Sequence, residues 1–304
     1  VYIPIPGNTK ADEFKYGHSS NSYIITEGKH FSFGIEIETS SGMLPRHCVY
    51  NKLNLNCVHD GSVEGGEYVT GILKGDLGFL QLNKICYELS RRCTVDEKTG
   101  LHIHLGGATF NKEFTVYSYL LGKRLEQEFF LSNPISRRGN RYCQVLPNIL
   151  DIKVAKSYLE CKNKEEYSKK MADGYSSIFT FISGGSPTSL KVNKKKQNPN
   201  GRYSSSRYHW LNLVTCNFIR ENNAPDFGNF INTNQNYTIE FRLPNGTLNY
   251  GCIKSWILVF MAFVWFVENN KRDIISKEDL NLEYVINQAF PKNGKLLSNF
   301  IDER

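Results

Sequence analysis

The stretch FSFGIEIET, residues 31–39, alternates apolar and acidic side chains from Phe33 onward. A period of two predicts a β-strand with one buried face. Because residues i and i+2 lie on the same face of a strand, Glu36 and Glu38 are expected to project together from one side of a sheet.

The same spacing of polar side chains recurs in two later strand candidates. The pairs are His102 and His104 in residues 101–105, and Glu240 and Arg242 in residues 237–243. Two further strands are predicted, over residues 63–70 and 208–215. The first of these contains Glu67 and is interrupted by Gly65 and Gly66, which is typical of a bulge.

Helices are predicted where apolar residues recur at helical spacing. The segments are residues 76–93 with Asp76 as the N-cap, residues 115–130, short stretches within 151–171, a helix from about Ile253, and smaller helices that close the chain. Strands and helices do not alternate as βαβ units, and the sequence shows no internal repeat. The order of elements therefore favours an α+β fold with a largely antiparallel sheet.

The longest apolar run covers residues 256–267. It is shorter than the ~20 residues that span a bilayer. We therefore expect a buried core helix there and no membrane partner.

The composition is that of an ordinary globular protein. Of the 304 residues, 40% are hydrophobic and 22% are charged, which excludes wholesale disorder. The chain is long enough for one large domain or two small ones. Its 37 Lys and Arg outnumber its 30 Asp and Glu, and the resulting net charge of +7 suits an anionic small substrate as well as a nucleic acid.

The eight cysteines are scattered and form no CxxC pair. Residues 1–7 lack the basic and apolar regions of a secretory signal. We therefore expect reduced, mostly buried thiols in a cytoplasmic protein. A zinc site remains an alternative for one set of potential ligands, although its spacing matches no standard finger. The set comprises His47, Cys48, Cys57 and His59.

Acidic and imidazole groups on one sheet face need neutralisation, because burying them without partners is costly. Carboxylates with imidazole and no thiolate suit Mg²⁺ or Mn²⁺ better than zinc. Several carboxylates in one site are typical of metal-bridged phosphates, as in ATP-dependent chemistry. The residues that we expect on this face are Glu36, Glu38, Glu67, Glu240 and His102.

Five segments together resemble the amidoligase family of the glutamine synthetase and glutamate–cysteine ligase superfamily. In order, they are FGIEIE (33–38), DGSVEGGE (60–67), TGLHIHLGG (99–107), RYHWLNL (207–213) and IEFRLPNGTLN (239–249). The resemblance implies a glutamine synthetase-like catalytic domain, in which a curved antiparallel sheet carries helices on its outer face and a site for ATP and two or three divalent metals on its inner face. It implies a reaction in which a carboxylate is phosphorylated and an amine then attacks the acyl phosphate to form an amide.

The resemblance also implies roles for individual residues. One metal is assigned to Glu38, Glu67 and Asp60. The metal near the γ-phosphate is assigned to Glu36, His102 and Glu240. The residues assigned to the nucleotide phosphates, the transferring phosphoryl group or the substrate carboxylate are His104, Arg242 and Arg207.

Outside these segments the chain is divided by composition. Residues 1–30 are polar and turn-rich and are expected to form an extended arm, with the catalytic domain over 31–304. Residues 132–206 match no family segment and are expected to form an acceptor pocket or flap. Within them KKKQNPNGR, residues 194–202, is expected to be a solvated loop or a flap whose Lys195 binds the nucleotide.

Two other functions remain open at this stage. The fold implied by the resemblance also serves phosphotransferases, which stop at phosphoryl transfer. The lysine-rich loop could contact nucleic acid in a catalytically inactive binding protein, but no nucleic-acid motif accompanies it. Neither the carboxylate nor the amine substrate can be read from the sequence.

Overall fold

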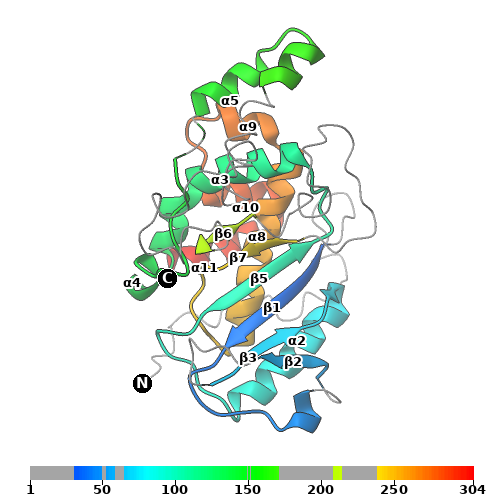
Figure 1. Ribbon diagram of the computed structural model, residues 1–304, viewed down its shortest axis with the longest axis vertical. Coiled ribbons are helices and arrows are strands. Elements are labelled where there is room, and N and C mark those ends of the chain that lie inside the picture. Colours follow the sequence, from blue (N-terminus) through cyan, green and yellow to red (C-terminus); the bar gives the residue numbers. More distant parts are fainter. Residues whose placement is uncertain are drawn as a thin grey trace, which may run out of the picture.

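The computed structural model describes residues 31–49, 53–58, 65–148, 150, 152–170, 208–213 and 238–304. Within these ranges the protein is α+β, with one open antiparallel sheet and several helices (Figure 1). The predicted N-terminal arm (1–30) and the lysine-rich loop (194–202) lie outside the described residues.

The sheet has seven strands in the order β2-β3-β1-β5-β7-β6, and β4 pairs with β1. Every described pairing between strands is antiparallel. The strands are β1 (Ser32–Glu38), β2 (Leu55–Val58), β3 (Glu67–Thr70), β4 (Leu73–Lys74), β5 (Leu101–Gly106), β6 (Leu211–Asn212) and β7 (Ile239–Phe241).

The FSFGIEIET stretch, residues 31–39, contains strand β1, which lies between β3 and β5 in the sheet. In β1, Phe33, Ile35 and Ile37 are buried, while Glu36 between them is only half-buried. The alternation predicted from the sequence is therefore confirmed, and it gives the sheet one apolar and one polar face.

Three predicted strands are shorter than expected. The one predicted over residues 63–70 begins only at Glu67 within the described residues. The strand predicted over residues 208–215 is reduced to β6 within the described residues. The Tyr208 carbonyl and the Trp210 amide bond to Gln144, while the Trp210 carbonyl accepts from the Arg242 amide beside β7. Within its described residues, 238–243, the strand predicted over 237–243 is reduced to β7. Strand β2 was not predicted, since its four residues show no alternation long enough to recognise.

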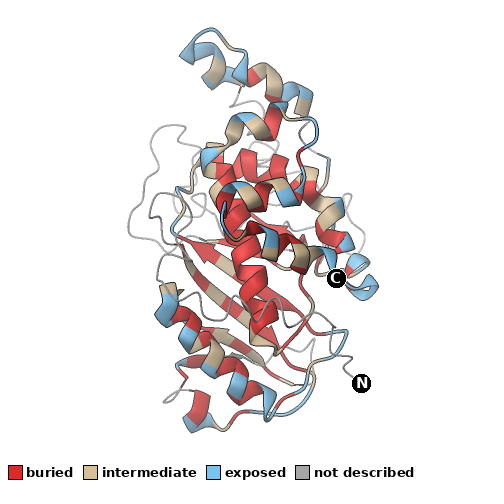
Figure 2. Ribbon diagram, turned by 180° about the vertical axis from the view of Figure 1, so that it is seen from behind, coloured by how far each residue is buried: buried red, intermediate tan, exposed pale blue. Residues whose placement is uncertain are grey.

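Two helices cover the apolar face of the sheet, and α3, α9, α10 and α11 pack against one of these, α8. Figures 1 and 2 show α2 and α8 covering this face. The helices are α2 (Gly75–Ser90), α3 (Lys112–Leu131), α4 (Ile135–Arg138), α5 (Ile152–Leu159), α8 (Tyr250–Asn269), α9 (Lys271–Ser276), α10 (Leu282–Ala289) and α11 (Gly294–Asp302). The N-cap prediction for Asp76 is wrong: Lys74 occupies that position, and Asp76 lies in the first turn, where its charge favours the helix dipole.

Helix α8 is the centre of the core. It begins earlier than predicted because the Asn249 side chain caps it, accepting a hydrogen bond from the Cys252 amide at 2.8 Å. Phe260 stacks on Phe241 of β7 with ring centroids 4.0 Å apart. Among the described residues, α8 alone is long and apolar enough to cross a membrane, but 94% of its most apolar window is buried inside the fold, as expected of a core helix.

The seven cysteines in the described part of the chain are all free, and most of them are buried. This agrees with the prediction of reduced, buried thiols. Cys216 lies outside the described residues.

Lys254 of α8 provides a pH-dependent prediction. Its side chain is fully buried, with the ammonium 5.3 Å from the ring centre of Phe79. Burial lowers the pKa of Lys254 to about 8 from its ordinary 10.5, against the opposing charge of Asp76. Because the unfolded chain then binds more protons between pH 8 and 10.5, this group makes the protein more stable as pH rises through that window.

We expect Lys254→Met to raise the free energy of unfolding by about 2 kcal/mol at pH 7, because Met removes the cost of burying the charge. The gain should shrink toward pH 10.5. Urea unfolding of both proteins at pH 7 and pH 10 measures the difference. An equal gain at the two pH values would contradict the assigned pKa.

Candidate functional site

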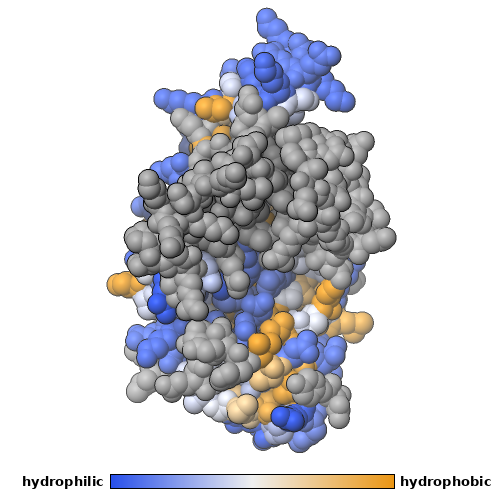
Figure 3. Space-filling model, viewed as in Figure 1, coloured by the Kyte–Doolittle hydropathy of each residue, from blue (hydrophilic) through white to orange (hydrophobic). Residues whose placement is uncertain are grey.

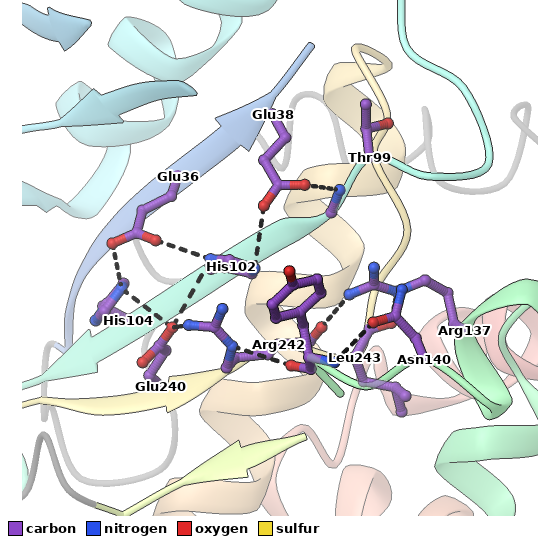
Figure 4. Close-up of polar contacts among 12 residues, drawn as sticks. Glu36, Glu38, Thr99, His102, His104, Arg137, Asn140, Glu240, Arg242 and Leu243 are labelled. Atoms are coloured by element: carbon purple, nitrogen blue, oxygen red, sulfur yellow. Dashed lines mark hydrogen bonds and ion pairs between the residues drawn. The ribbon is translucent and has the colours of Figure 1, made fainter. Parts of the chain in front are cut away.

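The polar face of the sheet brings together side chains from strands that are distant in sequence (Figure 4). Antiparallel pairing sets Glu36 opposite His102, Glu38 opposite Glu67, and His104 opposite Glu240. The i, i+2 spacing of β1 and β5 therefore produces a compact group of carboxylates and imidazoles, which we call the carboxylate block. Its members are Glu36, Glu38, Glu67, Glu240, His102 and His104. Figure 3 looks onto this side of the molecule, and hydrophilic residues gather near the middle of the view.

Glu36 lies between the two histidines. Its Oε2 is 2.8 Å from Nδ1 of His102, and its Oε1 is 3.0 Å from Nε2 of His104. Burial would raise the pKa of Glu36, but the hydrogen bonds and charges of the two histidines outweigh it and hold the pKa well below its usual range. Burial alone would lower the pKa of His104. The hydrogen bond to Glu36 and the charges of Glu36 and Glu240 outweigh burial, so the pKa of His104 is raised above its ordinary value. Glu36 is therefore ionised at neutral pH.

Glu240 is the most deeply buried carboxylate of the block, with only 3% of the residue exposed. Nη1 of Arg242 donates to its Oε1 at 2.5 Å, and the Asn212 side-chain amide donates to its Oε2. Nε of Arg242 also donates to the Tyr142 carbonyl at 3.3 Å. Contacts on two sides thus hold the Arg242 guanidinium at the edge of the carboxylate block.

Two groups of potential metal ligands overlap at one histidine. They are Glu36, His102 and Glu240, and Glu38, Glu67 and His102, each with ligand atoms within 4.8 Å of one another. Nδ1 of His102 faces Glu36 and lies 3.8 Å from Glu240, while Nε2 lies 3.8 Å from Glu38. The Glu38 carboxylate also accepts the Gly100 amide at 2.6 Å.

The donor chemistry fits divalent cations of the magnesium type. Four carboxylates and an imidazole converge without a thiolate, which is the oxygen-rich set that Mg²⁺ or Mn²⁺ prefers. His102 and Glu240 are nearly inaccessible to water, so the negative charge of the block is poorly screened by solvent. Metal binding itself remains a prediction.

The structure places seven of the ten predicted site residues on this one face. They are Glu36, Glu38, Glu67, His102, His104, Glu240 and Arg242. The other three, Asp60, Arg207 and Lys195, lie outside the described residues.

The zinc alternative gains no support from the described part of the chain. Nε2 of His47 lies 3.4 Å from Cys48 Sγ, but neither residue belongs to a described group of three or more metal-ligand atoms. The same holds for Cys57, and His59 lies outside the described residues.

Sequence reasoning missed three residues of the site. Asn212 stands opposite Glu240 in the register of β6 and β7, a relationship that only the pairing reveals. Gly100 precedes β5, and its missing side chain leaves space beside Glu38. Arg137 comes from α4 and follows no periodic pattern that could have identified it.

One comparison with known proteins identifies a family. A family model described as "putative amidoligase enzyme" matches residues 51–264, well over half of the 304 residues. The match includes β3, β5 and β7 with their site residues, and β1 lies before it but pairs with β3 and β5. No curated protein matches the chain.

Proposed function

The chain belongs to the amidoligase family, and from this premise we propose that it is an ATP-dependent carboxylate–amine ligase. In the proposed reaction a substrate carboxylate oxygen attacks the γ-phosphorus of ATP, forming an acyl phosphate and releasing ADP. An amine nitrogen then attacks the acyl carbon, the bond to phosphate breaks, and an amide, phosphate and a proton are formed. The proposed substrates are a small-molecule or peptide carboxylate and an amine.

The observation that carries this proposal is the block of carboxylates and imidazoles with an arginine at its edge. Phosphoryl transfer depends on positioning and charge neutralisation rather than on covalent help from the protein. We propose that one divalent cation is held by Glu36, His102 and Glu240, and another by Glu38 and Glu67, with Asp60 as an added ligand. Bound there, Mg²⁺ or Mn²⁺ supplies the positive charge that neutralises the ATP phosphates.

The remaining proposed roles belong to cationic side chains. Arg242 presents a planar fork that can bind two oxygens of a phosphoryl group or a carboxylate, and its contacts to Glu240 and to the Tyr142 carbonyl pre-orient it. His104 lies at the exposed side of Glu36, with 21% of its side chain accessible, where it can meet phosphate oxygens. Arg207 and Lys195 keep the phosphate-binding roles predicted from the sequence.

A first experiment avoids the unidentified substrates. Thermal unfolding with MgCl₂ alone, ATP alone and both together should show a rise in melting temperature of a few degrees that needs both, because a ligand at 100 times its Kd adds about 2.7 kcal/mol. Isothermal titration with Mn²⁺ should show divalent-cation binding. Absence of both responses would contradict the proposal.

The reaction products then separate the ligase from the phosphotransferase. With a productive acid and amine, a ligase yields ADP, free phosphate and an amide. Stable accumulation of a phosphorylated product, with no amide, would favour the phosphotransferase instead.

A further inference from the structure

Arg137 is a buried arginine beside the proposed site that the proposed chemistry has not yet used. It lies in the four-residue helix α4 and is only 2% exposed. A buried guanidinium is costly unless partners compensate the lost hydration. Its partners therefore show what the charge is there for.

The guanidinium holds the main chain immediately after β7. Nε of Arg137 donates to the Leu243 carbonyl at 3.2 Å, and its Nη2 donates to the Arg242 carbonyl at 2.6 Å (Figure 4). Strand β7 ends at Phe241, but the chain beyond it stays tied to its neighbours: the Arg242 amide donates to the Trp210 carbonyl and the Pro244 carbonyl accepts from the Leu101 amide. The two carbonyls that Arg137 binds lie between these contacts. Arg137 thus fixes the backbone from which the Arg242 side chain extends.

The same guanidinium approaches the carboxylate block from a second side. A Cβ atom placed on Gly100 would lie 3.3 Å from Nη2 of Arg137, 3.2 Å from Glu38 Oε2 and 3.3 Å from His102 Nε2. Three polar side chains therefore converge on the space that this glycine leaves. The block is flanked by two fixed positive charges, Arg242 at Glu240 and Arg137 near Glu38.

We propose that Arg137 is a positioning residue for the anion-binding step, an inference that rests on the proposed ATP-dependent function. Its clamp holds Arg242 where that guanidinium can bind a phosphoryl or carboxylate group. Its charge reduces the negative potential near Glu38, which disfavours a bare cation and favours a cation that arrives with an anionic nucleotide. Loss of the Arg137 charge should therefore strengthen binding of the bare metal and weaken binding of the nucleotide.

Arg138 provides a matched control on the same short helix. Its Nε donates to the carbonyls of Phe130 and Asn133, and its Nη2 donates to that of Leu131. These bonds are of the same kind as those of Arg137, but they are made at the end of α3 rather than at the carboxylate block. Loss of Arg138 therefore shows how much the loss of such carbonyl contacts lowers stability when no site residue is affected.

The test measures binding of two probes, Mn²⁺ alone and a non-hydrolysable ATP analogue with Mg²⁺, by calorimetric titration. We expect Arg137→Met to weaken binding of the analogue about tenfold or more, as for loss of charged hydrogen bonds, while Mn²⁺ binds at least as tightly as to the wild type. Arg138→Met should leave both affinities unchanged. A purely structural role would weaken both probes together with the melting temperature.

Arg137→Lys separates the effect of the positive charge from that of the two carbonyl contacts. It also replaces the Met variant in the test if that variant fails to fold. It keeps the charge but loses the two-pronged contact, so we expect wild-type Mn²⁺ affinity with weakened binding of the analogue. Wild-type affinity for both probes in the Arg137 variants, or parallel loss of both, would overturn this inference alone. A wild-type protein that binds neither probe would overturn the proposed function and this inference with it.

Discussion

Glu240→Gln is expected to abolish the MgATP-dependent rise in melting temperature and to lower ATP-dependent turnover by at least about 10²–10³-fold. The carboxylate is nearly fully buried and contacts both Arg242 and Asn212. An amide keeps the size of the side chain but removes the negative charge that a cation requires, and it leaves Arg242 without its charged partner. Thermal unfolding and release of ADP measure the two effects.

The matched control is Glu113→Gln on α3, a carboxylate that pairs with Lys271 and accepts from Tyr167 outside the site. Its MgATP response should equal that of the wild type. Glu36→Gln adds a variant at a more accessible position, with 24% of the side chain exposed, in case Glu240→Gln impairs folding. Wild-type nucleotide binding in both site variants would refute the metal assignment.

His102→Gln is expected to weaken both proposed metal sites at once. The imidazole belongs to both groups of potential ligands, with Nδ1 toward Glu36 and Nε2 toward Glu38. A neutral imidazole binds a cation through one nitrogen, and the N–H of the other can donate to a carboxylate that holds the second cation. Since loss of a residue that merely supports a ligand already costs 10–100-fold in metal affinity, loss of this group should weaken Mn²⁺ binding by at least about 100-fold. Calorimetric titration with Mn²⁺ measures affinity and stoichiometry together.

Glu67→Gln is the control that tells loss of a histidine shared by two metal sites from a general loss of metal binding through misfolding. Glu67 belongs to only one of the two groups, so its variant should weaken one site and leave the other at wild-type affinity. Unfolding in the presence of EDTA checks that each variant is folded without metal. A His102→Gln protein that retains one Mn²⁺ site of full affinity would show that the histidine is not shared.

Much of the site could be predicted from local pattern alone. The pairs in β1 and β5 and the pair of Glu240 with Arg242 follow from the alternation of side chains along a strand, which needs no tertiary information. The charge of these pairs predicted that they meet one another, because isolated buried carboxylates are unstable. The apolar run in α8 predicted the core helix in the same way.

Pattern alone did not reveal which strands are neighbours. Strand β7 pairs with β5 although more than 130 residues separate Glu240 from His104. Such pairing is decided by burial of both partners against α8, and no local signal records it. Asn212 was missed for that reason, since it is a site residue only through its register with Glu240.

The chemistry of the polar face therefore follows from the amino-acid sequence, because side-chain type and period-two spacing are local properties. The membership of His102 in two ligand groups and the approach of Arg137 to Gly100 arise only when the chain is folded. Arg137 reaches the block from a short helix by bonding to main-chain carbonyls. Carbonyls are the same at every residue, so their position is set by the folded backbone and leaves no trace in the order of the amino acids.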